Sequence, residues 1–331
     1  MKQQNELNVL PAVEGTGSTN GSTAKAGPEI ERPGNGRRDT AQGLDSDTQE
    51  AYHRQLFAGW YQMDAFWQGA LDLIGDKDDA IRLGLDQLGH FGPRGVALVA
   101  ERLVAATGGQ LTRVVELGSG FGGAIRHMGR LLRAQGISPW LIGVEFVAEH
   151  CELAAAIGRT MGDTEPLILN AAAMRLPFSS GEVDAVFVAG SASHFSSMGE
   201  VLAECHRVLR PGGVLVMTEE VSLRPQSAAS PGADFARHHP PEVFRATSPE
   251  QRRAEIEAAG LKIETFEQLT DWAVPLLRQR VNALKFMGKC ATQMFGPDAY
   301  EQMIGTLTSA ADEYERGTVL PTLIVARRVE Q

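Results

Sequence analysis

The amino-acid sequence has few cysteines, no excess of basic residues and no long apolar run. Its three cysteines, Cys151, Cys205 and Cys290, have the spacing of neither a disulfide framework nor a zinc site, so we expect buried thiols in a reducing compartment. A formal net charge of −10 disfavours nucleic-acid and anionic-membrane partners, since both reward a basic face. No uncharged apolar stretch of roughly 18 residues and no hydrophobic signal core near residue 1 is found, which predicts a cytoplasmic protein.

One stretch, residues 113–123, changes abruptly from an apolar run to glycines. We read this RVVELGSGFGG stretch as a buried strand, a tight turn and the start of a helix, which bring bare backbone against a nucleotide-like ligand. Gly118, Gly120 and Gly123 match the dinucleotide-binding pattern, which alone would indicate NAD. However, the carboxylate of Glu116, two residues before the first glycine, would repel a pyrophosphate and attract an ammonium or sulfonium group. S-adenosyl-L-methionine (SAM) is such a ligand.

Predicted strands alternate with predicted helices after this turn. The later strands are expected at residues 140–145, 166–170, 183–189, 214–218, 261–266 and 319–325. The helices are expected at residues 123–135, 147–161, 198–209, 249–259 and 271–316. Such alternation implies parallel crossovers, so we predict an α/β fold with a Rossmann-like, open, mostly parallel seven-stranded sheet and helices on both faces.

The chain is predicted to have four parts. Residues 1–45 are rich in Gly, Ser, Thr and Pro with almost no periodic apolar content, which predicts a disordered tail, or alternatively a tail that folds on a partner. Residues 46–91 repeat aromatic and apolar side chains at helical spacing, which predicts an N-terminal helical lid or a helix packed on the main domain. Residues 92–221 are the predicted cofactor-binding core, and residues 222–331 supply a substrate loop, a helical cap and the last strands.

Four groups of residues together resemble a known family. They are VVELGSGFGG at 114–123, Glu145 at the end of the next strand, LPF at 176–178 followed by VDAV at 183–186, and HRVLRPGG at 206–213. In this order the chain resembles the class I SAM-dependent methyltransferases, particularly the small-molecule group that includes the ubiquinone/menaquinone, tocopherol and sarcosine methyltransferases. The resemblance is close over residues 92–221 and loose over the last strands.

The resemblance implies a SAM site at the carboxyl ends of the strands. Gly118, Ser119 and Gly120 would lie against the methionine part, Glu116 would help to hold its amino group, and Glu145 would accept from the ribose hydroxyls. Family members commonly have Asp where this chain has Ala172, so the contact to the adenine amino group is expected to be missing or to come from elsewhere, with Asn170 a candidate. The predicted cofactor set is Glu116, Gly118, Ser119, Gly120, Gly122, Glu145, Phe146, Asn170, Ala172, Ala173 and Ala189.

His194, in the loop after the predicted strand 183–189, is the predicted catalytic residue. If the acceptor is a hydroxyl or an amine, its imidazole could take the proton as the methyl group transfers, because an unperturbed histidine titrates near neutral pH. The alternative is a residue of the pocket wall that only orients the substrate. Tyr61, Ser191 and Trp272 are predicted substrate contacts, and no metal is predicted.

A basic patch occurs in the stretch 222–247, which is predicted to be a long surface excursion. It consists of Arg237, His238, His239 and Arg245. We expect a solvated loop or, alternatively, an anion grip for a phosphorylated substrate.

The leading hypothesis is a SAM-dependent methyltransferase that acts on an oxygen or nitrogen of a small molecule of secondary metabolism. One alternative is carbon methylation of an isoprenoid diphosphate, but related carbon methyltransferases often have Glu where this chain has Gly190 and Ser191. A SAM-binding protein with a non-methylating reaction and an NAD-dependent oxidoreductase are the others. The expected partner is a small-molecule acceptor rather than nucleic acid or membrane, and a homodimer is left open.

Overall fold

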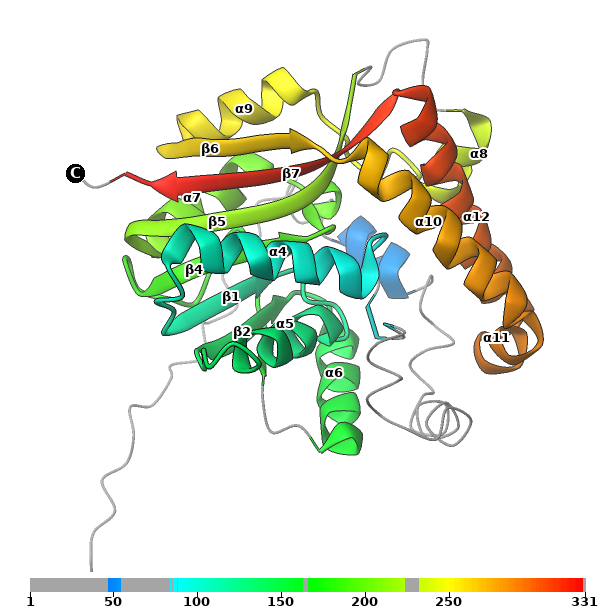
Figure 1. The fold of residues 1–331 in the computed structure, drawn as a ribbon, viewed down its shortest axis with the longest axis horizontal. Coiled ribbons are helices and arrows are strands. Elements are labelled where there is room, and N and C mark those ends of the chain that lie inside the picture. The colour runs from blue at the N-terminus through cyan, green and yellow to red at the C-terminus, as the bar shows by residue number, and fades with distance from the viewer. Residues whose placement is uncertain are drawn as a thin grey trace, which may run out of the picture. The chain divides into compact units, whose positions relative to one another are not determined.

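The computed structural model describes residues 47–54, 84, 86–87, 89–162, 166–223 and 232–329. These residues build one seven-stranded sheet with helices on both faces and a further group of helices beyond one end of the strands (Figure 1). The strand order is β3-β2-β1-β4-β5-β7-β6, so the predicted α/β, Rossmann-like fold is confirmed. The predicted tail, residues 1–45, and most of the predicted lid lie outside the described residues.

All seven predicted strands are present. They are β1 Arg113–Leu117, β2 Trp140–Glu145, β3 Leu167–Asn170, β4 Val183–Ala189, β5 Leu209–Ser222, β6 Leu261–Gln268 and β7 Val319–Arg328. The helices are α4 Gly92–Thr107, α5 Gly123–Arg133, α6 Ala148–Met161, the 3-10 turn η1 Ala192–His194, α7 Met198–Val208, α8 Ala233–His238, α9 Pro249–Ala258, α10 Thr270–Phe286, α11 Gly288–Phe295 and α12 Pro297–Arg316. Residues 47–54 are also helical.

The sheet is parallel over five strands and antiparallel at one side. β1 pairs in parallel with β2 and β4, β2 with β3, and β4 with β5, whereas β7 pairs antiparallel with both β5 and β6. The carboxyl ends of β1, β2, β4 and β5 therefore meet at one edge, where ligands of such sheets bind. β5 begins at Leu209 rather than at the predicted 214, because Leu209 is already paired with Val183.

Alternate residues of the buried strands pack on opposite faces of the sheet. Val114 of β1 lies in a core cluster with apolar residues of α4 and α5, whereas Val115 lies in a second cluster with residues of α7 and α9. This division follows from the two-residue period of a strand, which sends neighbouring side chains to opposite faces. Because both faces are covered, the central strands read as continuous apolar runs in the sequence.

A third apolar cluster joins α10 and α12 to the stretch after β5. Phe235 of α8 and Phe244 are 3 % and 8 % exposed, and both pack with Tyr314 of α12. The prediction of a surface excursion at 222–247 is therefore wrong for its second half, where single aromatic residues anchor a polar segment in the core of the cap. The predicted helical region 271–316 is divided into three helices, with Gly288 beginning α11 and Gly296 preceding α12.

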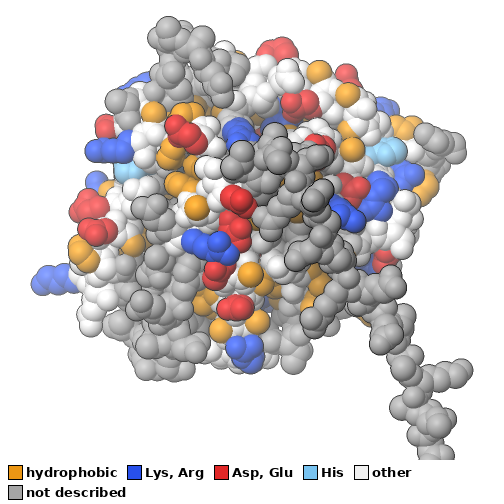
Figure 2. Space-filling model, turned by 180° about the vertical axis from the view of Figure 1, so that it is seen from behind, with side chains coloured by type: hydrophobic (Ala, Val, Ile, Leu, Met, Phe, Trp, Pro, Cys, Tyr) orange, Lys and Arg blue, Asp and Glu red, His pale blue; other side chains and the backbone are white. Residues whose placement is uncertain are grey.

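Surface charge is mixed on the face opposite to that in Figure 1. In Figure 2 basic and acidic side chains are interspersed on this face rather than gathered in one basic field. Among the described helices, none combines the length and apolarity needed to cross a bilayer.

Candidate cofactor and substrate site

The glycine turn follows β1 directly and starts α5, as predicted. Gly118 and Gly120 have φ of 67° and 52°, values that favour glycine because they are costly for other L residues. The amides of Gly118 and Ser119 both donate to the carbonyl of Val144 on β2, at 2.9 and 3.1 Å. A Cβ atom on Gly118 would come within 2.6 Å of Ser191 Oγ, so the loop after β4 closes on this turn. Side chains are excluded at this position.

Glu116 contributes a carboxylate that lacks a full set of partners. It is 2 % exposed, and its Oε2 atom has no hydrogen-bond partner among the described residues. Burial raises the pKa of Glu116 well above its usual range, although the nearby Arg126 opposes this. The same turn carries a second buried oxygen, Ser119 Oγ, for which the described part of the chain offers no partner. Both residues border the cavity described below, where a ligand with an ammonium group can satisfy them.

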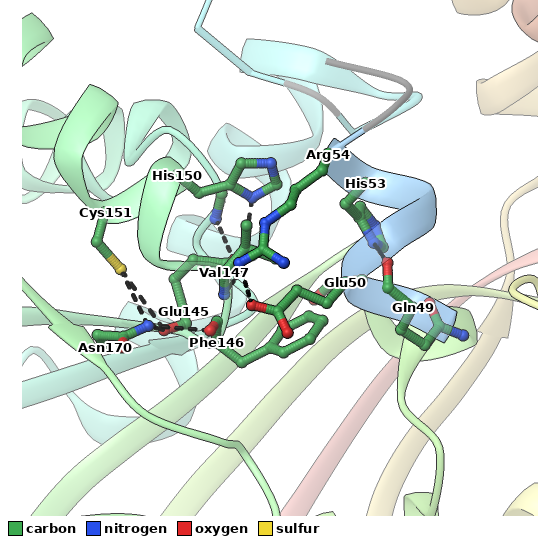
Figure 3. Close-up of polar contacts among 12 residues, drawn as sticks. Gln49, Glu50, His53, Arg54, Glu145, Phe146, Val147, His150, Cys151 and Asn170 are labelled. Atoms are coloured by element: carbon green, nitrogen blue, oxygen red, sulfur yellow. Dashed lines mark hydrogen bonds and ion pairs between the residues drawn. The ribbon is translucent and has the colours of Figure 1, made fainter. Parts of the chain in front are cut away.

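Glu145 is the centre of a polar cluster at the end of β2 (Figure 3). Its Oε2 accepts from the amide of Gly120 and its Oε1 from the amide of Val147, each at 2.9 Å. His150 lies 3.5 Å from Oε1. Burial alone would raise the pKa of Glu145, but His150 and the two amides hold it below its usual range. The carboxylate is therefore ionised at neutral pH and can still accept further hydrogen bonds, such as those of a ribose.

Asn170 is committed to the backbone of β2. Its Nδ2 atom donates to the carbonyls of Glu145 and Phe146, at 3.1 and 2.9 Å (Figure 3). Its Oδ1 atom is the remaining group for an adenine contact. Ala172 and Ala173 instead border a small cavity of about 50 Å³ that also touches Gly118 and Phe146.

One large cavity connects the glycine turn with the helical cap. Its volume is about 980 Å³. At one end it is lined by residues of the predicted cofactor set: Glu116, Gly118, Ser119, Gly120, Glu145, Phe146 and Ala189. At the other end it is lined mainly by apolar residues of the cap, including Ala283, Leu284, Met287, Met303 and Leu307. A cavity of this size and lining is typical of a small-molecule site.

Gly122 and Asn170 are not among the described residues that line either cavity. Gly122 instead precedes α5, and a Cβ atom there would lie 2.8 Å from Arg126 Nη1. Arg126 forms a buried ion pair with Asp86, with Nη2 and Oδ2 at 2.9 Å, which attaches the segment before α4 to the turn. Sequence reasoning missed this pair because the two residues lie on different elements.

The predicted substrate contacts have different outcomes. Ser191 lines the large cavity and donates from Oγ to the carbonyl of Leu117 at 2.7 Å. Trp272 packs against Phe91, with ring centroids 5.5 Å apart, and does not appear among the described residues of the cavity wall. Tyr61 lies outside the described residues.

His194 lines the cavity between its two ends. Its Nδ1 atom donates to the carbonyl of Val243 at 3.0 Å, which leaves the lone pair on Nε2. Burial, reinforced by the nearby His53, lowers the pKa of His194 to about 3. The ring is therefore neutral at physiological pH and binds a proton weakly.

Six of the eight histidines line this cavity, which sequence reasoning did not foresee. They are His53, His90, His150, His194, His238 and His239. They belong to separate segments of the chain and have no common spacing, so no motif could reveal them. Across the described ranges, no group of three or more His, Cys, Asp or Glu side chains is arranged to hold a metal ion.

The helical segment 47–54 lies across the site. Gln49 donates to the carbonyl of Val243 at 3.2 Å, and Arg54 pairs with Glu149 of α6 at 2.6 Å. Figure 3 shows Gln49, His53 and Arg54 on this segment, beside Phe146 and His150. His53 contacts the rings of His150 and His194, with centroids 5.9 and 5.1 Å apart. This segment thus connects the cofactor end of the cavity with the stretch before α9.

Two arginines of the predicted basic patch contact other residues of this chain. Arg237 pairs with Asp234 at 2.9 Å, and Arg245 donates to the carbonyls of Ser196 and Glu242. His239 is 6 % exposed, so the prediction of a solvated loop is wrong for this residue.

The strand order, the glycine turn and the two buried oxygens beside it, which have no partner among the described residues, are those of a class I SAM-dependent methyltransferase domain. Residues 115–217 match the family model described as "Methyltransferase domain", so this stretch of the chain is a methyltransferase domain. Because Glu116, Ser119 and Glu145 line one end of the large cavity, the residues present fit the cofactor of the family.

The chain is similar to several known proteins. It is 25% identical over 150 residues to 27-O-demethylrifamycin SV methyltransferase of Amycolatopsis mediterranei, covering 45% of this chain and 55% of the relative. It is 28% identical over 161 residues to dimethylglycine N-methyltransferase of Parasynechococcus marenigrum, covering 49% and 55%. The chain thus spans about half the length of these curated relatives.

A solved structure shares the fold. It is the structure described as that of "a putative sarcosine dimethylglycine methyltransferase from Galdieria sulphuraria". The TM-score is 0.60, and the identity is 16% over 72% of this chain and 85% of that chain. At this identity the likeness concerns the fold alone.

Proposed function

We propose that the protein transfers the methyl group of SAM to an oxygen or nitrogen atom of a small molecule of secondary metabolism. The observation that carries this proposal is the large cavity of about 980 Å³ that joins the glycine turn to apolar residues of the cap. SAM would supply a methyl group on a sulfonium: a lone pair of the acceptor would bond to the methyl carbon while the bond from carbon to sulfur breaks and S-adenosylhomocysteine leaves. The names of the two curated relatives, one an oxygen and one a nitrogen methyltransferase, support either acceptor atom.

The residues of the chain supply binding and orientation. Glu116 and Ser119 offer buried oxygens to the amino group of the cofactor, and Glu145 offers a carboxylate to its ribose. The apolar lining under the cap excludes water from the acceptor end, which favours transfer to the acceptor over side reactions.

The test of this proposal has two stages. SAM, but not NADH, is expected to raise the melting temperature of the protein, because a ligand that binds only the folded state stabilises it. S-adenosylhomocysteine is then expected to form only when a suitable acceptor from a metabolite panel is present. Stabilisation by NADH alone would contradict the proposal. If the protein binds both SAM and an acceptor but forms no S-adenosylhomocysteine, a non-methylating reaction would be favoured.

We further propose that His194 contacts the nucleophilic group of the acceptor. Its low pKa favours hydrogen-bond acceptance through Nε2, and therefore orientation, over complete proton uptake. His194→Ala is expected to lower kcat by about tenfold to a hundredfold. The nucleophile gains positive charge as it is methylated, and a lost hydrogen bond to a charged group costs about 1.5–3 kcal/mol. The Kd for SAM should change little, and the pH profile should keep its shape.

Calorimetry of SAM binding and initial rates across pH measure these effects. His206→Ala is a suitable control, because His206 lies on α7 and is not among the residues lining the cavity. Near-normal turnover of the His194 variant would exclude both a base and an orienting role for this residue.

A further inference from the structure

Two cavity histidines and one carboxylate form a continuous array at the acceptor end. His90 Nδ1 lies 2.8 Å from Glu220 Oε1, and the hydroxyl of Tyr314 donates to the same oxygen at 2.8 Å. On the other side of the ring, His90 Nε2 lies 3.2 Å from His239 Nε2. His239 Nδ1 in turn lies 3.2 Å from the carbonyl of Phe235. His90, Glu220 and His239 all line the large cavity.

The array is held by four separate parts of the fold. Glu220 lies near the end of β5 and is 4 % exposed, and Tyr314 of α12 is fully buried. The ring of Phe235 stacks on that of His239, with centroids 4.0 Å apart and planes 15° from parallel. Arg280 of α10 donates to the carbonyls of Gly89 and His90, which fixes the backbone beside the first ring. The two rings therefore have little freedom to rotate apart.

The hydrogen bonds of the array determine how many protons the two rings hold. The contacts to Glu220 and to Phe235 each face an oxygen acceptor, so His90 Nδ1 and His239 Nδ1 must both carry a hydrogen. The contact between the two Nε2 atoms needs one further hydrogen, because two lone pairs at 3.2 Å repel each other. With all contacts satisfied, the two imidazoles share three protons beside one carboxylate.

The surrounding groups indicate where the third proton resides. Burial, together with the neighbouring His90, lowers the pKa of His239 to about 3, so this ring is the neutral one. Burial alone would raise the pKa of Glu220, but His90 and Tyr314 hold it below its usual range, so the carboxylate is ionised. The adjacent Glu219 is directed instead to Arg252. When the pair holds three protons, its positive charge is therefore best balanced on the ring that lies between Glu220 and His239.

We propose that the His90–His239 pair is the proton acceptor for the methyl acceptor, with Glu220 as its positioning residue. In the form with two protons, the facing Nε2 lone pairs repel each other at 3.2 Å, and a proton received between them removes this repulsion. The O–H or N–H bond of the acceptor breaks, its proton enters this site, and its electron pair stays on the oxygen or nitrogen that forms the new bond to the methyl carbon. The catalytic role of the pair rests on the proposed function, whereas the number of protons that the two rings share does not.

The proton count can be tested on the full chain without any acceptor. In protein labelled with ¹⁵N-histidine, NMR is expected to show a hydrogen on Nδ1 of His239, and the signals of both rings are expected to change together when the pair gains its third proton. In Glu220→Gln the three-proton form of the pair is expected to be less populated at a given pH, because the facing negative charge is lost. His238→Gln, the control, lines the same cavity and should leave the pair unchanged. Independent titration of the two rings, or an Nε2–H tautomer of His239 with neutral His90, would overturn the inference.

Activity gives the second readout once an acceptor is found. His90→Gln is expected to lower kcat by about 10²–10⁴-fold, the usual contribution of a positioned base, with KM and the Kd for SAM little changed. Acceptors that are already anionic should lose far less. If wild-type protein fails to bind SAM, the proposed function fails while the proton count stands; if SAM binds and His90→Gln turns over normally, this inference alone is wrong.

Discussion

Gly120→Val is expected to abolish SAM binding, weakening it by at least roughly a hundredfold, or about 2.8 kcal/mol. Gly120 has φ of 52° and its amide donates to Glu145, so a branched side chain both strains the turn and occupies the space beside the carboxylate. Calorimetric titration with SAM measures the effect. The fold should persist, because the turn lies at the cavity rather than in the core.

Gly108→Val is the matched control for this change. Gly108 has φ of 62°, and a Cβ atom there would meet nothing within 4 Å. The Gly108→Val variant therefore has a similar backbone strain of about 1–2 kcal/mol, but its new side chain does not touch the site. Tight SAM binding by Gly120→Val would show that the glycine turn is not the cofactor cradle, whereas equal loss in both variants would attribute the effect to stability.

Arg252→Met is expected to destabilise the protein by about 3–5 kcal/mol, because it leaves a buried carboxylate unpaired. Arg252 of α9 and Glu219 of β5 are 2 % and 1 % exposed, and Nε lies 2.8 Å from Oε1. The double variant Arg252→Met with Glu219→Leu should recover most of the loss, since an apolar pair has no charge to desolvate. Chemical unfolding of the three proteins measures the free energies, and a single variant as stable as the double one would contradict this account.

The loss should depend on pH in a defined direction. Burial, opposed by Arg252, raises the pKa of Glu219 to about 7 from an ordinary 4.5. The folded state thus binds this proton more tightly than the unfolded chain, so the contribution of Glu219 favours folding below pH 4.5 and is lost as the pH rises through about 7. Without Arg252 the carboxylate is harder still to ionise, and the destabilisation should be larger at alkaline than at acidic pH.

The fold and the positions of the glycine turn and of Glu145 were predictable because their signals are local. The glycine turn after β1 and the acid ending β2 each lie within a few residues of a strand, so a periodic pattern fixes their position. Asn170 illustrates the limit of this reasoning, because its place after β3 is as expected but its amide donates to the backbone of β2. Which partner a polar side chain takes depends on neighbours that only the folded chain supplies.

The acceptor end could not be predicted for the same physical reason. His90, Glu220 and His239 come from three segments far apart in the sequence, and each alone reads as an ordinary polar residue. The stretch around Phe235 was misjudged because its composition is polar and rich in Pro, while its packing depends on a few aromatic anchors. Long-range contacts made by single residues produce no periodic pattern in the sequence.

The position of β7 imposes an order on the assembly of the protein. β7 is the latest of the seven strands in the sequence, yet it lies inside the sheet and holds β6 to β5. During synthesis β1 to β5 can pair as they emerge, whereas β6 must wait, unpaired, until residues 319–328 arrive. Glu219 and Glu220 face Thr322 and Pro321 of the same late strand. The part of the cavity wall that Glu220 supplies is therefore complete only after β7 has been made.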